Sequence, residues 1–401
     1  MTAPLTGVRV VDFGQFIAAP AATQILVDLG ADVIKVEPVH GESARQIGLY
    51  GEAIIRNYNR NKRAIAIDLK DQRGRSVAWD LIAGADIVVQ NLRPGVLDSF
   101  GLGPDTVRAA YPGIVYATVT GFGSHGPSKS RAGLDIAAQA ESGIMSVTGE
   151  ADGEPQRVGF PVVDAAAAHV FAQAILGAYV RRLRTGEGDT VETSLLEVAV
   201  HLQGPNWGEY FLTGNEPTRK GNGQPTVAPA ADVMPTSDGS IVVSAYSAVH
   251  FTRLCRLIGR PELATDPRFT DNVLRVRHRP ELLAELRATF ATFTTDDAMA
   301  LLTGNGVVAG RISSYREVRT NPDVEAAGIF IDATDAHGIE YPTLASPWHL
   351  GSIDRPSTTG APELGAHTEE LLVELGYSEA QIDELVDGEV VRALRCPALI
   401  P

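Results

Sequence analysis

Short β-branched runs alternate with helix-like segments along the first 120 residues, and this alternation limits the possible folds more than any other feature of the chain. Helical patterns cover Ala18–Leu29 and Gly74–Ala83, and Pro94 begins a further turn of helix. The runs between them have little outward polarity, which is typical of strands covered on both faces. Repeated strand–helix–strand units predict an α/β fold with a mostly parallel, doubly wound sheet. The predicted strands are Val8–Asp12, Val33–Val36, Ala64–Ile67, Ile87–Val89 and Ile114–Val119.

The remaining two thirds of the chain change character twice. A long apolar helix is expected over Ala165–Arg184, and residues 214–239 are rich in Gly, Pro and polar residues, as in a linker or mobile loop. After it come strand-like and helix-like runs of a different pattern: Ile241–Ala245, 248–258, 278–293 and Val307–Ile312. Two helices, Ala366–Leu375 and Ser378–Leu385, then follow near the end of the chain.

These changes predict three parts. Residues 1–213 form a large Rossmann-like domain, 214–325 a linker with a smaller α+β domain, and 326–401 a part that returns to the large domain.

Charge and composition exclude several classes of function. The formal net charge is −15, which disfavours a nucleic-acid or anionic-membrane partner. No uninterrupted apolar run reaches about 18 residues, and the first residues have no secretory signal pattern. Two cysteines, Cys255 and Cys396, make no disulfide framework and no metal-ligand spacing. We expect a cytoplasmic enzyme or binding protein.

One segment is basic against this acidic background. Residues 60–75 hold six cations and two acids. Such a run is either a solvated face that balances nearby acids or a site for a small polyanion such as a nucleotide, and charge alone does not decide between them.

Motifs for redox and metal chemistry fail on their context. Gly121–Gly126 fits G-x-G-x-x-G, but the residues that follow are poor helix material, whereas a dinucleotide site requires a helix to begin there. No zinc-protease, Cys-x-x-Cys, P-loop or G-x-S-x-G motif occurs. We expect no metal and no nicotinamide or flavin.

Asp164 is the most informative carboxylate. It follows the strand-like run Val158–Val163 and precedes the long apolar helix. This position suits a helix N-cap. It equally suits a nucleophile, since a helix N-terminus stabilises an ionised carboxylate and only the ionised form attacks an acyl carbon. Both interpretations stay open from the residues alone.

Several segments in a fixed order resemble the class III CoA-transferase family, which includes formyl-CoA transferases, carnitine CoA-transferases and α-methylacyl-CoA racemases. The resemblance covers the whole chain, and its specificity comes from the set rather than from one motif. The segments are Gly7–Asp12, Leu29–Pro38, Asn61–Arg63 with Leu69–Lys70, Asn91–Gly95, Gly121–Pro127, Arg131–Asp135, the segment at Asp164, and Pro362–Thr368.

The resemblance implies roles for several residues. Asp164 matches the family's catalytic aspartate, which carries the acyl group as a mixed anhydride and CoA as a thioester. Four residues fall at the family's CoA contacts: Lys70, Asn91, Leu92 and Arg131. Ile17, Asp135, Gly221 and Gly223 are expected near the substrates. The family further implies an interlocked homodimer, acyl-CoA and a small carboxylic acid as substrates, and no cofactor beyond the CoA thioester.

Departures from the family pattern narrow the choice of substrate. Formyl-CoA transferases carry a guarding glutamine where this chain has Ile17, and CoA-binding arginines where it has Pro38 and Ser99. Racemases carry a histidine at the position of Leu134, and proton exchange needs both an acid and a base. CoA transfer is therefore the expected activity. The alternatives are racemase-type proton exchange and a CoA-binding protein without turnover.

Overall fold

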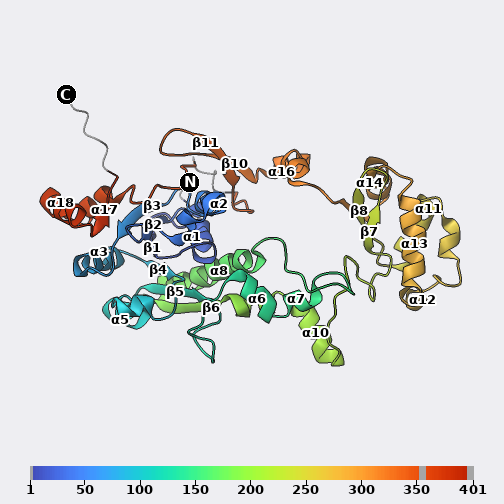
Figure 1. Cartoon of the computed structure of the whole chain (residues 1–401), viewed down its shortest axis with the longest axis horizontal. Coiled ribbons are helices and arrows are strands. Elements are labelled where there is room, and N and C mark those ends of the chain that lie inside the picture. The colour runs from blue at the N-terminus through green and yellow to red at the C-terminus, as the bar shows by residue number, and fades with distance from the viewer. Residues whose placement is uncertain (1–2, 352–357, 395–401) are drawn as a thin grey trace. The chain divides into compact units, whose positions relative to one another are not determined.

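A computed structural model describes residues 3–351 and 358–394 (Figure 1). The chain divides into two compact units. Unit 1 comprises residues 1–144, 158–207 and 327–401, and unit 2 comprises residues 145–157 and 208–326. The smaller domain was expected to comprise residues 214–325. Unit 2 instead begins at Gly208, ends at Ala326 and also includes residues 145–157, which were expected in the large domain.

Unit 1 is built on a seven-stranded sheet in the order β12-β3-β2-β1-β4-β5-β6. Six strands are parallel, and β12 alone pairs antiparallel, with β3. The direction in which strands are added reverses between β1 and β4, which is the switch point of a doubly wound sheet. The strands are β1 (Arg9–Asp12), β2 (Asp32–Glu37), β3 (Arg63–Ile67), β4 (Ile87–Gln90), β5 (Val115–Thr120), β6 (Asp189–Ser194) and β12 (Val391–Arg392).

Alternate residues of these strands enter two separate cores. Val10 packs on one face of the sheet and Val11 on the other, as the two-residue period of a strand requires. Helices α1 (Ala18–Asp28) and α8 (Val162–Thr185) cover the first face. The second face is covered by α3 (Gln72–Ala83), α17 (Thr368–Glu374) and α18 (Glu379–Asp387).

Shorter elements of unit 1 connect or flank the sheet. These are η1 (Ser43–Gln46), α2 (Gly48–Tyr58), α4 (Val96–Ser99), α5 (Pro104–Ala110), α6 (Asp135–Glu141), α9 (Leu195–His201) and the hairpin β10 (Phe330–Thr334) with β11 (Glu340–Leu344). Three helices of the described chain span the limits of the units: α7 (Ile144–Val147), α10 (Gly204–Thr213) and, by its last residue, α16 (Pro322–Ala327).

Helix α8 is apolar enough, over 24 residues, to cross a membrane by length and composition. In this fold it instead packs along α1 and against β5 and β6. Its buried residues recur at helical spacing on one face, from Val163 through Phe171 to Ala178. Gly186 ends the helix with φ +76°, after basic residues in the last turn.

Unit 2 contains a three-stranded antiparallel sheet with helices packed on it. Its strands are β7 (Asp232–Pro235), β8 (Ser240–Ser244) and β9 (Val308–Arg311). The helices are α11 (Ala248–Leu257), η2 (Pro261–Ala264), α12 (Asn272–Arg277), α13 (Arg279–Phe290), α14 (Thr295–Thr303), α15 (Tyr315–Arg319) and α16 (Pro322–Ala327).

The five strands predicted in the first 120 residues are all present, in parallel. Two predictions of local structure are wrong. Residues 232–235, within the stretch expected to be a linker or mobile loop, form β7 and pair with β8. Residues 158–161 form no strand, and α8 begins at Val162 rather than Ala165. Helix α2 and strand β6 were not predicted from the sequence.

Candidate active site

An open cleft of about 450 Å³ lies at the carboxyl ends of the central strands, where the strand order reverses. Ligands of doubly wound sheets bind at this place because the loops on either side of the switch point diverge. The loop after β1 contributes Gln15–Ala18, and the loop after β4 contributes Asn91–Pro94. The end of β5, residues 131–134 and Asp164 complete the lining.

Asp164 lies in the first turn of α8 and reaches the cleft. It is the third residue of the helix, not its N-cap. That position belongs to Pro161, which makes no side-chain cap bond. The interpretation of Asp164 as a helix cap is therefore wrong. Its carboxylate is half-buried, and no hydrogen-bond donor to it is found among the residues that the structure describes.

Asp135 caps α8 from another part of the chain. Its Oδ2 accepts the peptide N–H of Val163 at 2.8 Å and that of Asp164 at 3.1 Å. Its Oδ1 accepts from Gln139 Nε2 at 2.5 Å, and Gln139 Oε1 in turn accepts from the Val158 N–H. Two backbone N–H groups at the start of α8, which have no acceptor within the helix, thus bond a side chain 29 residues before Asp164.

This arrangement changes the expected charge of Asp164. Burial, with a further contribution from the Asp135 charge, raises the pKa of Asp164 to about 7. The helix N-terminus was expected to favour the ionised form of Asp164, but Asp135 already accepts the N–H groups of Val163 and Asp164 in the first turn. Near neutral pH the carboxyl group exists in both forms.

Tyr58 is an additional neighbour that the sequence did not indicate. It ends α2, and burial raises the pKa of its hydroxyl, with Asp164 among the charges that add to the rise. No sequence signal could have linked these two residues, since α2 itself was not predicted.

Close packing of two glycines shapes the wall of the cleft beside Asp135. The backbones of Gly121 and Gly133 meet so closely that a Cβ on either would lie 2.4 Å from the Cα of the other. This contact fixes the 131–135 segment, which carries both Arg131 and Asp135, against the end of β5. Gly121, the first glycine of the G-x-G-x-x-G match, therefore serves backbone packing, and no helix begins directly after the motif, since the next one, α6, starts at Asp135.

The four predicted CoA-contact residues differ in whether they line the cleft and in whether their side chains already have partners. Asn91 and Leu92 line the cleft, but the Asn91 amide is engaged on both sides with the Gln15 backbone, at 2.8 Å each. Arg131 lines the cleft, stacks its guanidinium 4.3 Å from the centre of the Phe122 ring and forms an ion pair with Glu141. Lys70 is exposed just beyond the carboxyl end of β3.

Most cations of the 60–75 stretch are committed to internal ion pairs. Arg60 pairs with Asp28, Lys62 with Asp12, and Arg63 with Asp32, Glu370 and Glu374, while Arg73 pairs with Asp71 and Glu384. Within the described part of the chain, the side chains of Lys70 and Arg75 have no carboxylate partner, and Arg75 instead donates to the carbonyls of Leu69 and Lys70. Among the described residues of this stretch, Lys70 is thus the cation whose exposed side chain has neither a carboxylate nor a carbonyl partner.

Arg93 lines the cleft and is exposed, and its side chain has no carboxylate partner in the described ranges. It lies within the Asn91–Gly95 segment but was not predicted as a site residue. Its position directly after Leu92 was the available signal.

Of the residues expected near the substrates, the structure brings Ile17 and Asp164 to one cleft, with Asp135 behind Asp164. Gly221 and Gly223 belong to unit 2. Gly221 has φ +63° and donates to the Gly149 carbonyl at 3.1 Å, and a Cβ at Gly223 would meet the Arg279 guanidinium. A role for these two glycines near substrate stays a prediction.

Comparison with known proteins identifies the family. The model of CoA-transferase family III matches residues 5–368. The succinate–glutarate CoA-transferase of Agrobacterium fabrum is 33% identical over 93% of this chain and 96% of its own length. The succinyl-CoA–D-citramalate CoA-transferase of Chloroflexus aurantiacus is 36% identical, over 97% and 98%. A CAIB/BAIF family protein from Brucella suis has a solved structure that superposes with a TM-score of 0.85 at 35% identity, covering 94% of this chain and all of that one. The chain described here belongs to CoA-transferase family III.

Proposed function

We propose that this protein transfers CoA between an acyl-CoA donor and a free carboxylic acid, with Asp164 as the covalent carrier. The observation that carries the proposal is the Asp164 carboxylate itself. It opens onto the cleft at the switch point, and it is not used as a helix cap, because Asp135 has that role. A half-buried carboxylate without a structural partner is available as a nucleophile.

The proposed route has four steps in which only acyl groups and the CoA thiolate move. The Asp164 carboxylate attacks the donor carbonyl and the C–S bond breaks, which gives an aspartyl anhydride and CoA thiolate. The thiolate attacks the aspartyl carbonyl and releases the donor acid, leaving an aspartyl-CoA thioester. The acceptor carboxylate displaces the thiolate to form a second anhydride. The thiolate then attacks the acceptor carbonyl, forming the new acyl-CoA and restoring Asp164.

This route needs no group beyond the CoA thioester, the acid and Asp164, so we propose no further cofactor. It requires Asp164 in the ionised form. A pKa of about 7 leaves a substantial ionised fraction at neutral pH, and a carboxylate that is costly to keep charged is also a stronger nucleophile. Apolar lining residues such as Ile17 and Leu195 limit access of the water that would hydrolyse an anhydride.

CoA is held, in this proposal, by cations and apolar groups of unit 1. Arg93 and Arg131 line the cleft, Lys70 is exposed beyond the end of β3, and these three cations supply charge for the CoA phosphates. Leu92 supplies apolar contact. Asn91 contributes by holding the loop after β1, since both ends of its amide are already bonded to Gln15.

Small dicarboxylic acids are the substrates to test first. The two relatives named above act, by their names, on succinate with glutarate and on succinyl-CoA with D-citramalate. We propose succinyl-CoA as donor and a dicarboxylic acid as acceptor. Proton exchange on the α-carbon is disfavoured, since Leu134 lines the cleft where racemases carry a histidine.

We also propose that the working form is an interlocked homodimer in the cytoplasm. Several large apolar side chains of unit 1 are exposed in the single chain, among them Leu49 at 90% and Leu183 at 68%. Exposed apolar surface of this kind is typical of a subunit interface.

The test uses purified protein, succinyl-CoA and a panel of ¹³C-labelled acids, with products identified by mass spectrometry. Label in a new acyl-CoA supports transfer, and its loss in Asp164→Asn supports the carrier role. Loss of α-deuterium from a labelled branched acyl-CoA without CoA exchange would support proton exchange instead. Binding of CoA with neither reaction would support a binding protein.

A further inference from the structure

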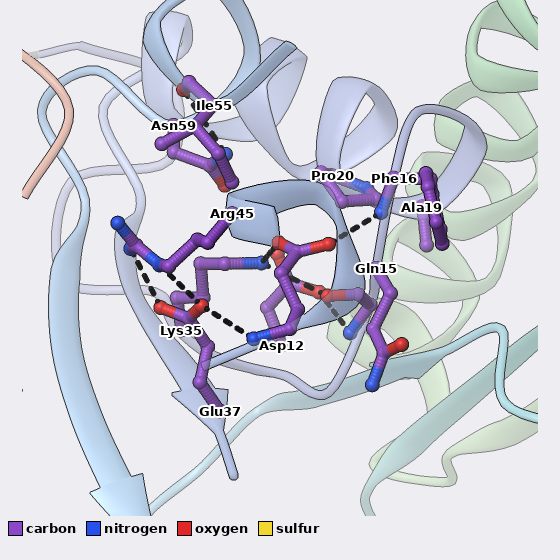
Figure 2. Close-up of polar contacts among 12 residues, drawn as sticks. Asp12, Gln15, Phe16, Ala19, Pro20, Lys35, Glu37, Arg45, Ile55 and Asn59 are labelled. Carbon is purple, nitrogen blue, oxygen red and sulfur yellow. Dashed lines mark hydrogen bonds and ion pairs between the residues drawn. The ribbon is translucent and has the colours of Figure 1, made fainter. Parts of the chain in front are cut away.

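A network of buried charges lies directly behind the cleft. It contains three carboxylates, Asp12, Glu37 and Glu42, and three cations, Lys35, Arg45 and Lys62. The side chains of Lys35, Glu42, Asp12 and Lys62 are completely inaccessible to solvent. Figure 2 shows Asp12, Lys35, Glu37 and Arg45 gathered beside the loop that follows β1.

Side chains of this network hydrogen-bond the backbone of the loop that follows β1. Gly14 N–H donates to Asp12 Oδ1 at 2.7 Å, and the Gly14 carbonyl accepts from Lys35 Nζ at 2.9 Å. Phe16 N–H donates to Glu42 Oε2 at 2.7 Å. Between them, Gln15 is held on both sides by the Asn91 amide. Every residue from Gly14 to Phe16 is thus tied to a side chain from a different part of the chain.

The loop needs this support because its conformation is unfavourable. Phe16 has φ +59°, a left-handed value that bulky residues rarely adopt and that persists only when the surroundings impose it. At Gly14, a Cβ would lie 2.6 Å from Asp12 Oδ1. The next residues, Ile17 and Ala18, line the cleft with Asp164 and begin α1, whose N-cap makes no side-chain bond of its own.

Glu42 joins the network to this strained residue. One oxygen of its carboxylate accepts the Phe16 N–H, and the other lies 2.7 Å from Lys35 Nζ. Lys35 in turn holds Gly14, so the loop is fixed at two points by one ion pair. Buried ion pairs contribute little net stability compared with apolar packing, and their best-attested use is to specify one arrangement.

We propose that Glu42 is a positioning residue for CoA transfer: by holding the Phe16 N–H beside Lys35, it sets the left-handed turn that places Ile17 and the start of α1 against the acyl group on Asp164. The inference rests on the proposed function. For the donor carbonyl to reach the Asp164 carboxylate in the correct geometry, the turn at Phe16 must be in place as well as Asp164 itself. Displacement of reacting groups by about 1 Å costs about a hundredfold in rate.

The test compares two variants at Glu42 with a matched control. Glu42→Ala removes the acceptor of the Phe16 N–H, whereas Glu42→Gln keeps an oxygen there and loses the charge. Asp28→Asn is the control. This substitution also removes a largely buried ion pair, the one between Asp28 and Arg60, but Asp28 contacts neither the turn nor the cleft. Two quantities are measured: hydrogen exchange of the peptide that contains Phe16, by mass spectrometry, and the separate kcat and KM for an established substrate pair.

The proposal predicts faster exchange at Phe16 and a kcat lower by about tenfold or more in Glu42→Ala, with KM for acyl-CoA within about threefold. Glu42→Gln falls between Glu42→Ala and wild type, and Asp28→Asn keeps kcat within about twofold. If Glu42→Ala does not fold, Glu42→Gln decides alone, by the same two readouts. Unchanged exchange at Phe16, an unchanged kcat, or an equal loss in Asp28→Asn overturns the proposal. A wild-type protein without transfer refutes the proposed function instead, and the exchange of Phe16 then decides whether Glu42 fixes the turn.

Discussion

Asp135 accepts the peptide N–H of Asp164 at 3.1 Å while its own charge opposes ionisation of the Asp164 side chain. One carboxylate therefore both anchors the helix that carries the nucleophile and makes that nucleophile costly to charge. The Asp135 charge adds to the rise in the Asp164 pKa that burial, the larger cause, already produces.

The first prediction concerns the pH dependence of the proposed reaction. The kcat/KM of the wild type should fall on the acidic side with an apparent pKa near 7, because the attacking form of Asp164 is the carboxylate. In Asp135→Asn, loss of the neighbouring charge should lower the apparent pKa of this acidic limb of the pH profile. The apparent pKa should still lie above that of an ordinary carboxyl group, since burial, the larger cause of the rise, is unchanged.

Its control is Glu141→Gln, which removes a negative charge from α6 on the side of Arg131 and should leave the limb where it is. An identical limb in Asp135→Asn and wild type would contradict the electrostatic coupling.

The second prediction concerns stability and needs no substrate. A carboxyl group with a raised pKa binds its proton more tightly in the folded than in the unfolded protein, so its contribution to stability is lost as pH rises from about 4 to about 7. Asp164→Asn should therefore gain stability relative to wild type over this range, by about 1–3 kcal/mol at pH 8 after allowance for partial exposure. Urea unfolding at pH 4.5 and pH 8 measures the difference, and a gain that is equal at both pH values would contradict the prediction.

The third prediction concerns capture of CoA. Alanine variants of Lys70, Arg93 and Arg131 should raise KM for the donor more than they lower kcat, and added salt should weaken the difference from wild type. Arg73→Ala is the matched control, because Arg73 is exposed in the same basic stretch but paired with Asp71 and Glu384. If the Arg73 variant changes KM as much as the others, the charge at the cleft has no special role.

The fourth prediction concerns assembly. Exposed Leu49 and Leu183 should lie in a subunit interface, so the midpoint of thermal unfolding should rise with protein concentration. Leu183→Glu should weaken this assembly. A folded monomer at micromolar concentration in light scattering would contradict an obligate dimer.

Much of the large sheet could be predicted because its signal is local. The five strands around β1 are short β-branched runs, and burial on both faces makes them nearly continuous in apolar residues. Helix α2 escaped prediction because its sequence, Gly48–Tyr58, contains two glycines and two tyrosines. Gly51 is required there, since a Cβ would lie 1.8 Å from the Ala44 carbonyl oxygen.

The site could be predicted only in part, because its decisive contacts join distant segments. Asp164 was singled out from the sequence, and the structure places it at the cleft. Asp135, whose carboxylate accepts the N–H groups of Val163 and Asp164 in the first turn of α8, is brought there only by the fold. Likewise Lys62 is cationic in the sequence but lies completely buried 3.0 Å from Asp12. Whether a charge is solvated, paired or available to a ligand is decided by tertiary packing.

The most direct test of the account is covalent trapping on Asp164. Hydroxylamine added during turnover with succinyl-CoA, or with another established donor, should convert the acylated or thioesterified Asp164 to a hydroxamate, seen as a mass change on the peptide that contains it. The same peptide should stay unmodified without donor and in Asp164→Asn, which should bind CoA but transfer none. Transfer by Asp164→Asn at a rate near that of wild type, with no hydroxamate in the wild type, would contradict the central claim.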